Sequence, residues 1–150
     1  MIQRIQTIYL LLVLICLSLV FIFPFATYSV NDQNYVFNVM GFDYDNGNQI
    51  KFPFYVGVSI VIALTLVTIL KYKNRKLQLK LGRFNYLALL VIIALSFVNV
   101  RTIEDMLGET AKVSFGAGLF LPVVALALLF LANRGIKKDE ELVKSLDRLR

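Results

Sequence analysis

The 150-residue chain has no histidine, no tryptophan and a single cysteine, Cys16. Histidine is the commonest general base at neutral pH and a frequent ligand of transition metals, so its absence argues against both kinds of site. One cysteine excludes a disulfide within the chain, and Cys16 lies in an apolar stretch as a small packing residue. A glycine-rich phosphate loop, a nucleophile elbow and a Cys-x-x-Cys pair are also missing. We therefore expect a protein that is not an enzyme and that holds no metal and no cofactor.

Charged residues are absent from four long stretches, each close to the 17 to 25 residues or so that cross roughly 30 Å of hydrocarbon. Hydrophobic residues make up 58% of the chain, and the mean hydropathy is +0.71. A soluble globule of this size has no means of hiding four such runs from water. Bulky residues follow the first run, so we expect a retained anchor and not a cleaved signal peptide. The predicted spans are about 5–26, 53–70, 84–100 and 113–132.

The basic residues predict the orientation of these spans, because lysine and arginine favour the cytoplasmic side. Of the 16 basic residues, all but Lys51, Arg101 and Lys112 lie before the first span, in the linker 71–83 or in the tail 133–150. The opposite side carries six acids: Asp32, Asp43, Asp45, Glu104, Asp105 and Glu109. Both termini are therefore expected in the cytoplasm. The net charge of +6 follows from this topology, and nucleic acid is not an expected partner.

The outer loop, 27–52, has the composition of a small sheet. Aromatic and β-branched residues fill 28–30, 35–40 and 49–52, and they alternate with turn clusters at 31–34 and 45–48. Asn46-Gly47 is a favoured type I′ pair. We predict an antiparallel β-element on the extracytoplasmic side. Its aromatic residues are candidates for partner contact: Tyr35, Phe37, Phe42 and Tyr44.

Residues inside the spans are suited to helix packing more than to transport. Small residues at four-residue spacing, Ser59 with Ala63 and Ser114 with Gly118, predict close helix approach. Pro122 predicts a kink in span four. The spans contain no ionisable residue, which argues against ion coupling. A ligand pocket near Gly118 and Pro122 is the alternative interpretation.

The tail is predicted to form a cytoplasmic amphipathic helix over 139–150. Leu142, Val143, Leu146 and Leu149 fall on one helical face. The mixed charge of this tail favours a helix that faces a partner, or lies at the interface, over a simple lipid-binding patch. Leu142 and Leu146 are the candidate contact residues.

Two terminal motifs carry a family resemblance: Gln3-Arg4-Ile5-Gln6-Thr7 at the start, and Ala132-Asn133-Arg134 followed by the run from Asp139 to Arg150 at the end. In these motifs the chain resembles a family of small four-span membrane proteins of Bacteroidota, of unknown function. The resemblance implies a bacterial inner (cytoplasmic) membrane location and four helices, but no reaction. Gly135 stands where alanine is expected in that family. The motifs direct attention to Gln3, Arg4 and Gln6, which we expect to meet Arg134 and the tail.

Together these features predict an all-α membrane protein. It is an up-down four-helix transmembrane bundle with a small extracytoplasmic antiparallel β-element and a cytoplasmic C-terminal amphipathic helix. The leading hypothesis is a non-catalytic accessory or scaffold subunit that contacts the lipid bilayer and docks a larger inner-membrane assembly. The alternative is a small transporter or lipid-binding protein with a pocket near the kink in span four. An enzyme that uses Glu104, Asp105 and Glu109 is a third, remoter candidate, because a solvated linker explains these acids.

Overall fold

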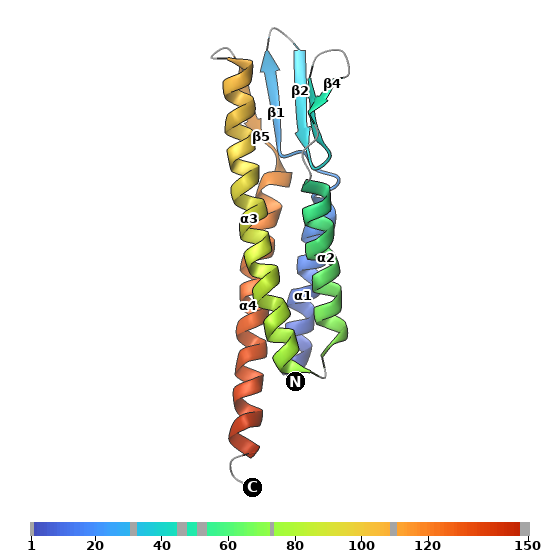
Figure 1. Cartoon of the computed structure of the whole chain (residues 1–150), viewed down its shortest axis with the longest axis vertical. Helices are drawn as coiled ribbons and strands as arrows, with labels where there is room; N and C mark the ends of the chain where they lie inside the picture. The colour runs from blue at the N-terminus through green and yellow to red at the C-terminus, as the bar shows by residue number, and fades with distance from the viewer. Residues whose placement is uncertain are drawn as a thin grey trace.

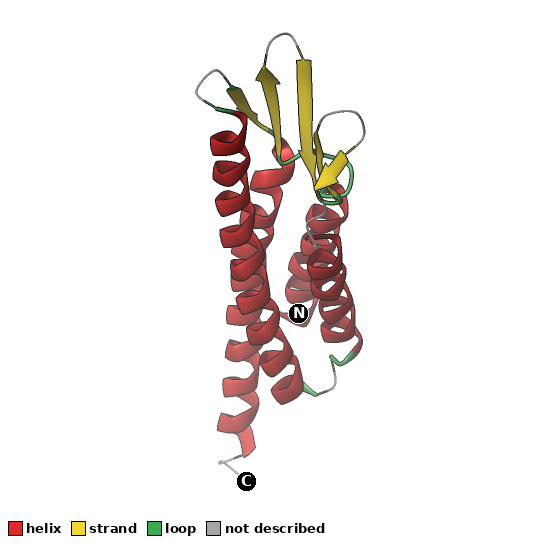
Figure 2. Cartoon of the chain, turned by 45° about the horizontal axis from the view of Figure 1, so that its top comes forward, coloured by secondary structure: helices red, strands yellow, loops and turns green. Residues whose placement is uncertain are grey.

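Four helices lie side by side, and a small sheet covers one end of them (Figures 1 and 2). This computed structural model describes residues 2–30, 33–44, 48–50, 54–72, 74–108 and 111–147. The helices are α1 (Ile2–Leu19), α2 (Phe54–Leu70), α3 (Arg75–Leu107) and α4 (Ala117–Asp147). The strands are β1 (Ala26–Val30), β2 (Gln33–Asn38), β3 (Gly41–Tyr44), β4 (Asn48–Ile50) and β5 (Lys112–Phe115).

The helices alternate in direction, so that α1 and α3 run toward the sheet while α2 and α4 run away from it (Figure 1). Helix α1 packs on α2 and α4, and α3 packs on the same two helices. The buried side chains of α2 recur every three or four residues, at Val58, Val61, Thr65 and Thr68, which is the period of a single helical face. The opposite faces of the helices are also apolar, as the exposed Ile60 and Val91 illustrate.

Two helical stretches in the described part of the chain are long and apolar enough to cross a membrane, Arg75–Leu107 and Ala117–Val143. Ile5–Leu19 and Phe54–Leu70 are shorter apolar helices. The structure therefore confirms a mostly helical chain in which two helices have the length and composition of membrane spans.

The five-stranded sheet is antiparallel, in the order β4-β3-β2-β1-β5. The predicted β-element in the first loop is confirmed, but its outer edge was missed. Strand β5 pairs with β1 in the register Ala26↔Phe115 and Tyr28↔Val113, in a stretch that the sequence assigned to span four. The sequence prediction included this strand in span four, because no charged residue separates Lys112–Phe115 from the apolar run that follows.

Helix boundaries differ from the sequence prediction at three places. Most of the linker 71–83 is helical, since α3 begins at Arg75, where Asn74 Oδ1 accepts from the amide N of Leu77 at 3.1 Å. Helix α3 continues to Leu107 and ends at Gly108, whose φ of 85° suits glycine. The tail is no separate helix, because α4 runs through Gly135 to Asp147. In a helical context one glycine costs only about 1 kcal/mol relative to alanine, too little to stop a long helix.

The predicted pair Ser114 and Gly118 is wrong, and the pair Ser59 and Ala63 packs no helix of this chain. Ser114 lies in β5 and Gly118 in α4, so the two share no helical face. Ser59 and Ala63 do share a face of α2, but both are exposed. Gly118 instead allows α4 to approach the segment after α1, where its amide N donates to the carbonyl O of Pro24 at 3.0 Å.

Buried aromatic side chains join the sheet to the helix ends. Phe25, Phe37 and Phe54 meet edge to face, with ring centroids 5.2 to 5.9 Å apart. The buried Tyr28 hydroxyl donates to the carbonyl O of Val100 on α3 at 3.0 Å. Burial, and to a smaller extent the charge of Glu104, raise the pKa of Tyr28, so the phenol is held neutral. The buried residues of the sheet therefore share one hydrophobic cluster with those of the helices.

Candidate functional site

Buried amide and hydroxyl side chains form a polar layer between the helices at the end opposite the sheet. Gln78 Nε2 donates to the carbonyl O of Thr68 at 3.1 Å, and Asn85 Nδ2 donates to Thr65 Oγ1 at 2.6 Å. Both bonds join α3 to α2. Each threonine hydroxyl in turn donates to a carbonyl of its own helix, four residues earlier. Interhelical bonds of this kind fix the register of packed apolar helices.

Two glycines bring α4 close to its neighbours beside this layer. A Cβ at Gly82 of α3 would collide with the side-chain oxygen of Asn133 and lie 2.9 Å from its Cγ. A Cβ at Gly135 would lie 2.9 Å from Cγ of Gln6 on α1. The two terminal motifs of the sequence therefore meet across α1 and α4. Asn133 Nδ2 also donates to the carbonyl O of Gly82 at 3.1 Å.

Some polar atoms in this region are buried without a hydrogen-bond partner. Among the residues described, they are Gln6 Nε2, Asn85 Oδ1 and Asn133 Oδ1. Each atom belongs to an amide side chain that bonds to a neighbouring helix or packs against a glycine there. Because an unpaired buried polar group costs free energy, these amides are where the helix packing is least satisfied.

Beyond the polar layer, charged side chains connect α3 to the outer part of α4. The Arg75 guanidinium donates to the carbonyl O of Asp139 at 3.0 Å and lies 3.9 Å from its carboxylate. Further along α4, Lys137 and Glu141 form an i, i+4 ion pair at 3.8 Å. That pair is largely exposed and contributes little to stability.

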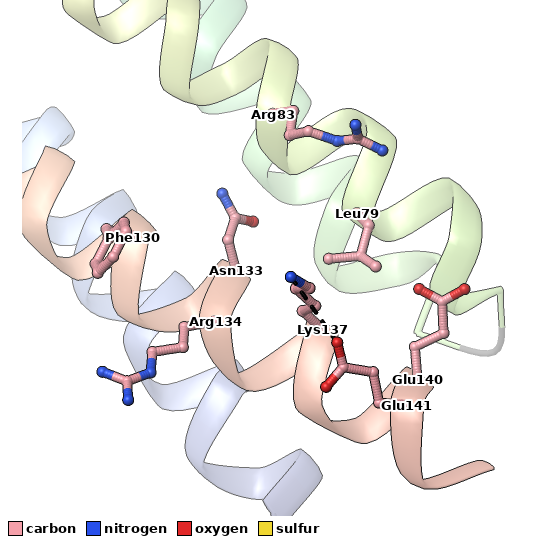
Figure 3. A pocket seen from close by; sticks show the side chains of 8 residues that line it. All are labelled: Leu79, Arg83, Phe130, Asn133, Arg134, Lys137, Glu140 and Glu141. Carbon is pink, nitrogen blue, oxygen red and sulfur yellow. Dashed lines mark ion pairs between the residues drawn. The ribbon is translucent and has the colours of Figure 1, made fainter. Parts of the chain in front are cut away.

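An open groove of about 590 Å³ lies between α3 and α4 at this end (Figure 3). We call it the basic groove. It is lined by Leu79, Arg83, Phe130, Asn133, Arg134, Lys137, Glu140 and Glu141. Asn133 and Lys137 project from α4 toward α3, while Arg83 extends from α3 on the facing side (Figure 3). Arg134 also lines the groove, but its side chain extends from α4 away from α3 (Figure 3). The lining therefore includes three basic residues and an apolar wall at Phe130.

The residues predicted from the terminal motifs are partly brought together here. Gln6 is buried and contacts Gly135, the neighbour of Arg134, while Arg134 itself is exposed in the basic groove. Gln3 and Arg4 belong to α1, but their side chains lie outside the described residues. Leu142 is 47% exposed on α4. The side chain of Leu146 is likewise outside the described part.

The aromatic candidates of the outer loop divide into buried and half-buried side chains. Phe37 and Phe42 are buried in the junction between the sheet and the helices, so neither ring is available to a partner in this structure. They were named as contact residues because sequence reasoning did not assign the faces of the strands. Tyr35 is half-buried, and its hydroxyl donates to Gln33 Oε1 at 2.7 Å. Tyr44 lies in β3, and its side chain is outside the described residues.

The basic groove was missed at the sequence level, although Arg134 was named. The sequence feature that indicates it is the position of two arginines: Arg83 immediately precedes one apolar run, and Arg134 closely follows another. In neighbouring antiparallel helices, residues at the start of one apolar run and at the end of the next lie at the same depth. The predicted up-down bundle makes the last two helices neighbours, but it does not say which of their faces meet, so the groove could not be located from the sequence pattern.

The pocket anticipated near the kink in span four does not coincide with the grooves described. Around Gly118 the space is filled by the backbone oxygens of Phe23 and Pro24. A second groove, of about 470 Å³, lies between α2 and α3 and is mainly apolar, with Phe54, Gly57, Ile92 and Leu95 among its lining residues. Within the described ranges, no group of three histidine, cysteine or acidic side chains is placed to hold a metal ion.

Comparison with known proteins assigns the chain to a family. The family described as "Domain of unknown function (DUF4293)" matches residues 2–149. The chain belongs to this family. No curated protein and no solved structure matched the chain. The DUF4293 assignment covers the helices, the sheet and the basic groove alike, so all of them belong to one family unit.

Proposed function

We propose that this DUF4293 protein is a non-catalytic accessory or scaffold subunit of the bacterial inner membrane, which docks a larger assembly through its cytoplasmic end. The observation that carries the proposal is the end of α4. Helix α4 continues past the ends of α1, α2 and α3 (Figure 1). On this projecting part Leu142 and Val143 are 47% and 40% exposed.

Apolar outer surfaces support four membrane spans. Each of the four helices exposes large aliphatic or aromatic side chains, among them Ile8, Ile15, Ile60, Leu66, Phe84, Val98, Val124 and Phe130. Water would penalise these faces, whereas lipid tails solvate them. Helices α1 and α2 pack alongside the two longer helices, so a bilayer that surrounds α3 and α4 also surrounds them.

The orientation is proposed from the charges at the two ends. Arg75, Lys76, Lys80 and Arg83 on α3, with Arg134, Lys137 and Lys138 on α4, lie at the end away from the sheet. The positive-inside rule places that end in the cytoplasm and the sheet outside.

Thiol labelling tests this orientation. On a Cys16→Ala background, Met40→Cys in the turn between β2 and β3 and Ser145→Cys on α4 each supply one exposed thiol. We expect a membrane-impermeant maleimide to label Met40→Cys in intact spheroplasts, and Ser145→Cys only after lysis. Equal labelling of both variants before lysis would contradict the proposed topology.

The docking proposal is tested at Leu142. Leu142→Glu places a charge on the exposed apolar part of α4, and we expect it to reduce the protein that co-purifies or cross-links with the chain in mild detergent by about tenfold or more. Leu142→Met is the matched control, because it keeps an apolar side chain of similar volume, and it should retain the complex. A chain that runs as a solitary monomer in every mild detergent, with no cross-linked product, refutes the proposal.

A further inference from the structure

We propose that the basic groove binds the phosphate of an anionic phospholipid in the leaflet at the end opposite the sheet. The proposal rests on the membrane orientation proposed above, and it adds a ligand site to it. The chemistry required is a phosphate diester that meets two guanidinium groups and an ammonium group, with an acyl chain directed along an apolar helix wall.

The groove lies at the level where the helices change from polar to apolar. Gly82 and Asn133 are in direct contact, so the next residues along each chain, Arg83 and Arg134, lie at the same depth on antiparallel helices. On the membrane side of this level Phe84 is 60% exposed and Phe130 is 54% exposed. Lipid headgroups occupy this boundary, and basic pockets between membrane helices on the cytoplasmic side are known sites for anionic headgroups.

The charges along the groove are ordered from basic to acidic. Arg83, Arg134 and Lys137 lie at or near the boundary, whereas Glu141 is seven residues beyond Arg134, or about 10 Å further along the helix. Both arginines and Lys137 are exposed, so their side chains are free to turn toward an anion. Guanidinium groups bind phosphate oxygens through paired hydrogen bonds.

The existing ion pair of Lys137 does not block this role. Lys137 and Glu141 are 3.8 Å apart, with 72% and 64% of their side chains exposed. A pair so exposed is weak, and Lys137 exchanges Glu141 for a phosphate at little cost. Glu140 and Glu141 disfavour a second anion at the outer end, which limits the site to one headgroup.

Phe130 distinguishes a lipid from a soluble phosphate. It lies four residues before Arg134, on the same face of α4, and forms the apolar wall of the groove (Figure 3). An acyl chain that descends from a headgroup at Arg134 passes directly over this ring. Inorganic phosphate has no group to place there.

The test uses the purified full-length chain in mild neutral detergent, with native mass spectrometry to measure bound lipid. Phosphatidylglycerol is the probe, phosphatidylcholine is the zwitterionic comparison, and inorganic phosphate is added as a soluble competitor. We expect phosphatidylglycerol to bind in preference to phosphatidylcholine. Arg83→Gln combined with Arg134→Gln should weaken that binding by about tenfold or more, since each basic residue near a membrane surface contributes on this scale.

The matched control is Lys76→Gln combined with Lys138→Gln, which also removes one positive charge from each of α3 and α4. Both lysines are exposed and neither lines the groove, so their charges are screened from a phosphate bound there and binding should fall clearly less than in the groove variant. Equal losses in the two double variants would overturn the assigned site. Equal binding of both lipids would overturn the charge argument. Displacement by inorganic phosphate at the same concentration would make the ligand a soluble anion. Thiol labelling of the sheet and tail reports the orientation independently of these results.

Discussion

Alanine at Gly118 is expected to lower the free energy of unfolding by about 3 kcal/mol, the upper end of the usual cost of overpacking. The position of the new Cβ is occupied by the backbone carbonyl oxygens of Phe23 and Pro24, the second at 2.7 Å. Backbone atoms do not rotate away as a side chain does. To make room for the new methyl group, α4 therefore has to shift, and this shift weakens the hydrogen bond from Gly118 N to the carbonyl O of Pro24. Reversible unfolding in mixed micelles measures the change.

Gly57→Ala is the matched control on α2. Its nearest neighbours are side-chain carbons of Ile92 at 3.4 Å, an ordinary contact distance. Replacing a helical glycine with alanine recovers up to about 1 kcal/mol of helix propensity, so the control should be neutral or stabilising. If Gly118→Ala and Gly57→Ala have the same effect, the close approach of α4 to the Phe23–Pro24 backbone does not limit stability.

The sequence predicted those parts of the fold that depend on one segment at a time. Uncharged apolar runs identified the helices, and turn clusters between β-branched residues identified the strands of the first loop. Strand β5 was missed because its identity depends on pairing with β1, a strand far away in the sequence: the partners Ala26 and Phe115 are 89 residues apart, and Ser29 and Lys112 are 83 apart. Neither strand's own pattern indicates this pairing.

The candidate site was predictable only in part, for a similar reason. The sequence motif that contains Gln6 and the motif that contains Arg134 do meet, and Gly135 is the point of contact. Arg83 was not singled out, since its place at the same depth as Arg134 depends on which faces of α3 and α4 meet. Phe37 was named as a contact residue, although it is buried in this structure, because alternation along β2 leaves two possible buried faces until the sheet is placed on the helices.

Phe37→Ala distinguishes a structural role of the Phe37 ring in the core from a role in docking a partner. The ring is fully buried and meets Phe25 at 5.2 Å and Phe54 at 5.9 Å, edge to face in both cases. Removing a buried phenyl group typically costs 3–5 kcal/mol, from lost transfer free energy and the cavity left behind. We therefore expect a large fall in the free energy of unfolding, with the sheet becoming accessible to protease before the helices do.

Val36→Ala is the control, because Val36 is the adjacent residue of β2, faces the other side of the sheet and is 36% exposed. It should cost less than about 1 kcal/mol, since little apolar surface is lost from the core. A docking role for the Phe37 ring makes the opposite prediction: Phe37→Ala would leave stability unchanged while a partner is lost. Because the ring contacts both the loop after α1 and the first residue of α2, the expected loss of stability would show that the sheet is held to the helices by this aromatic cluster.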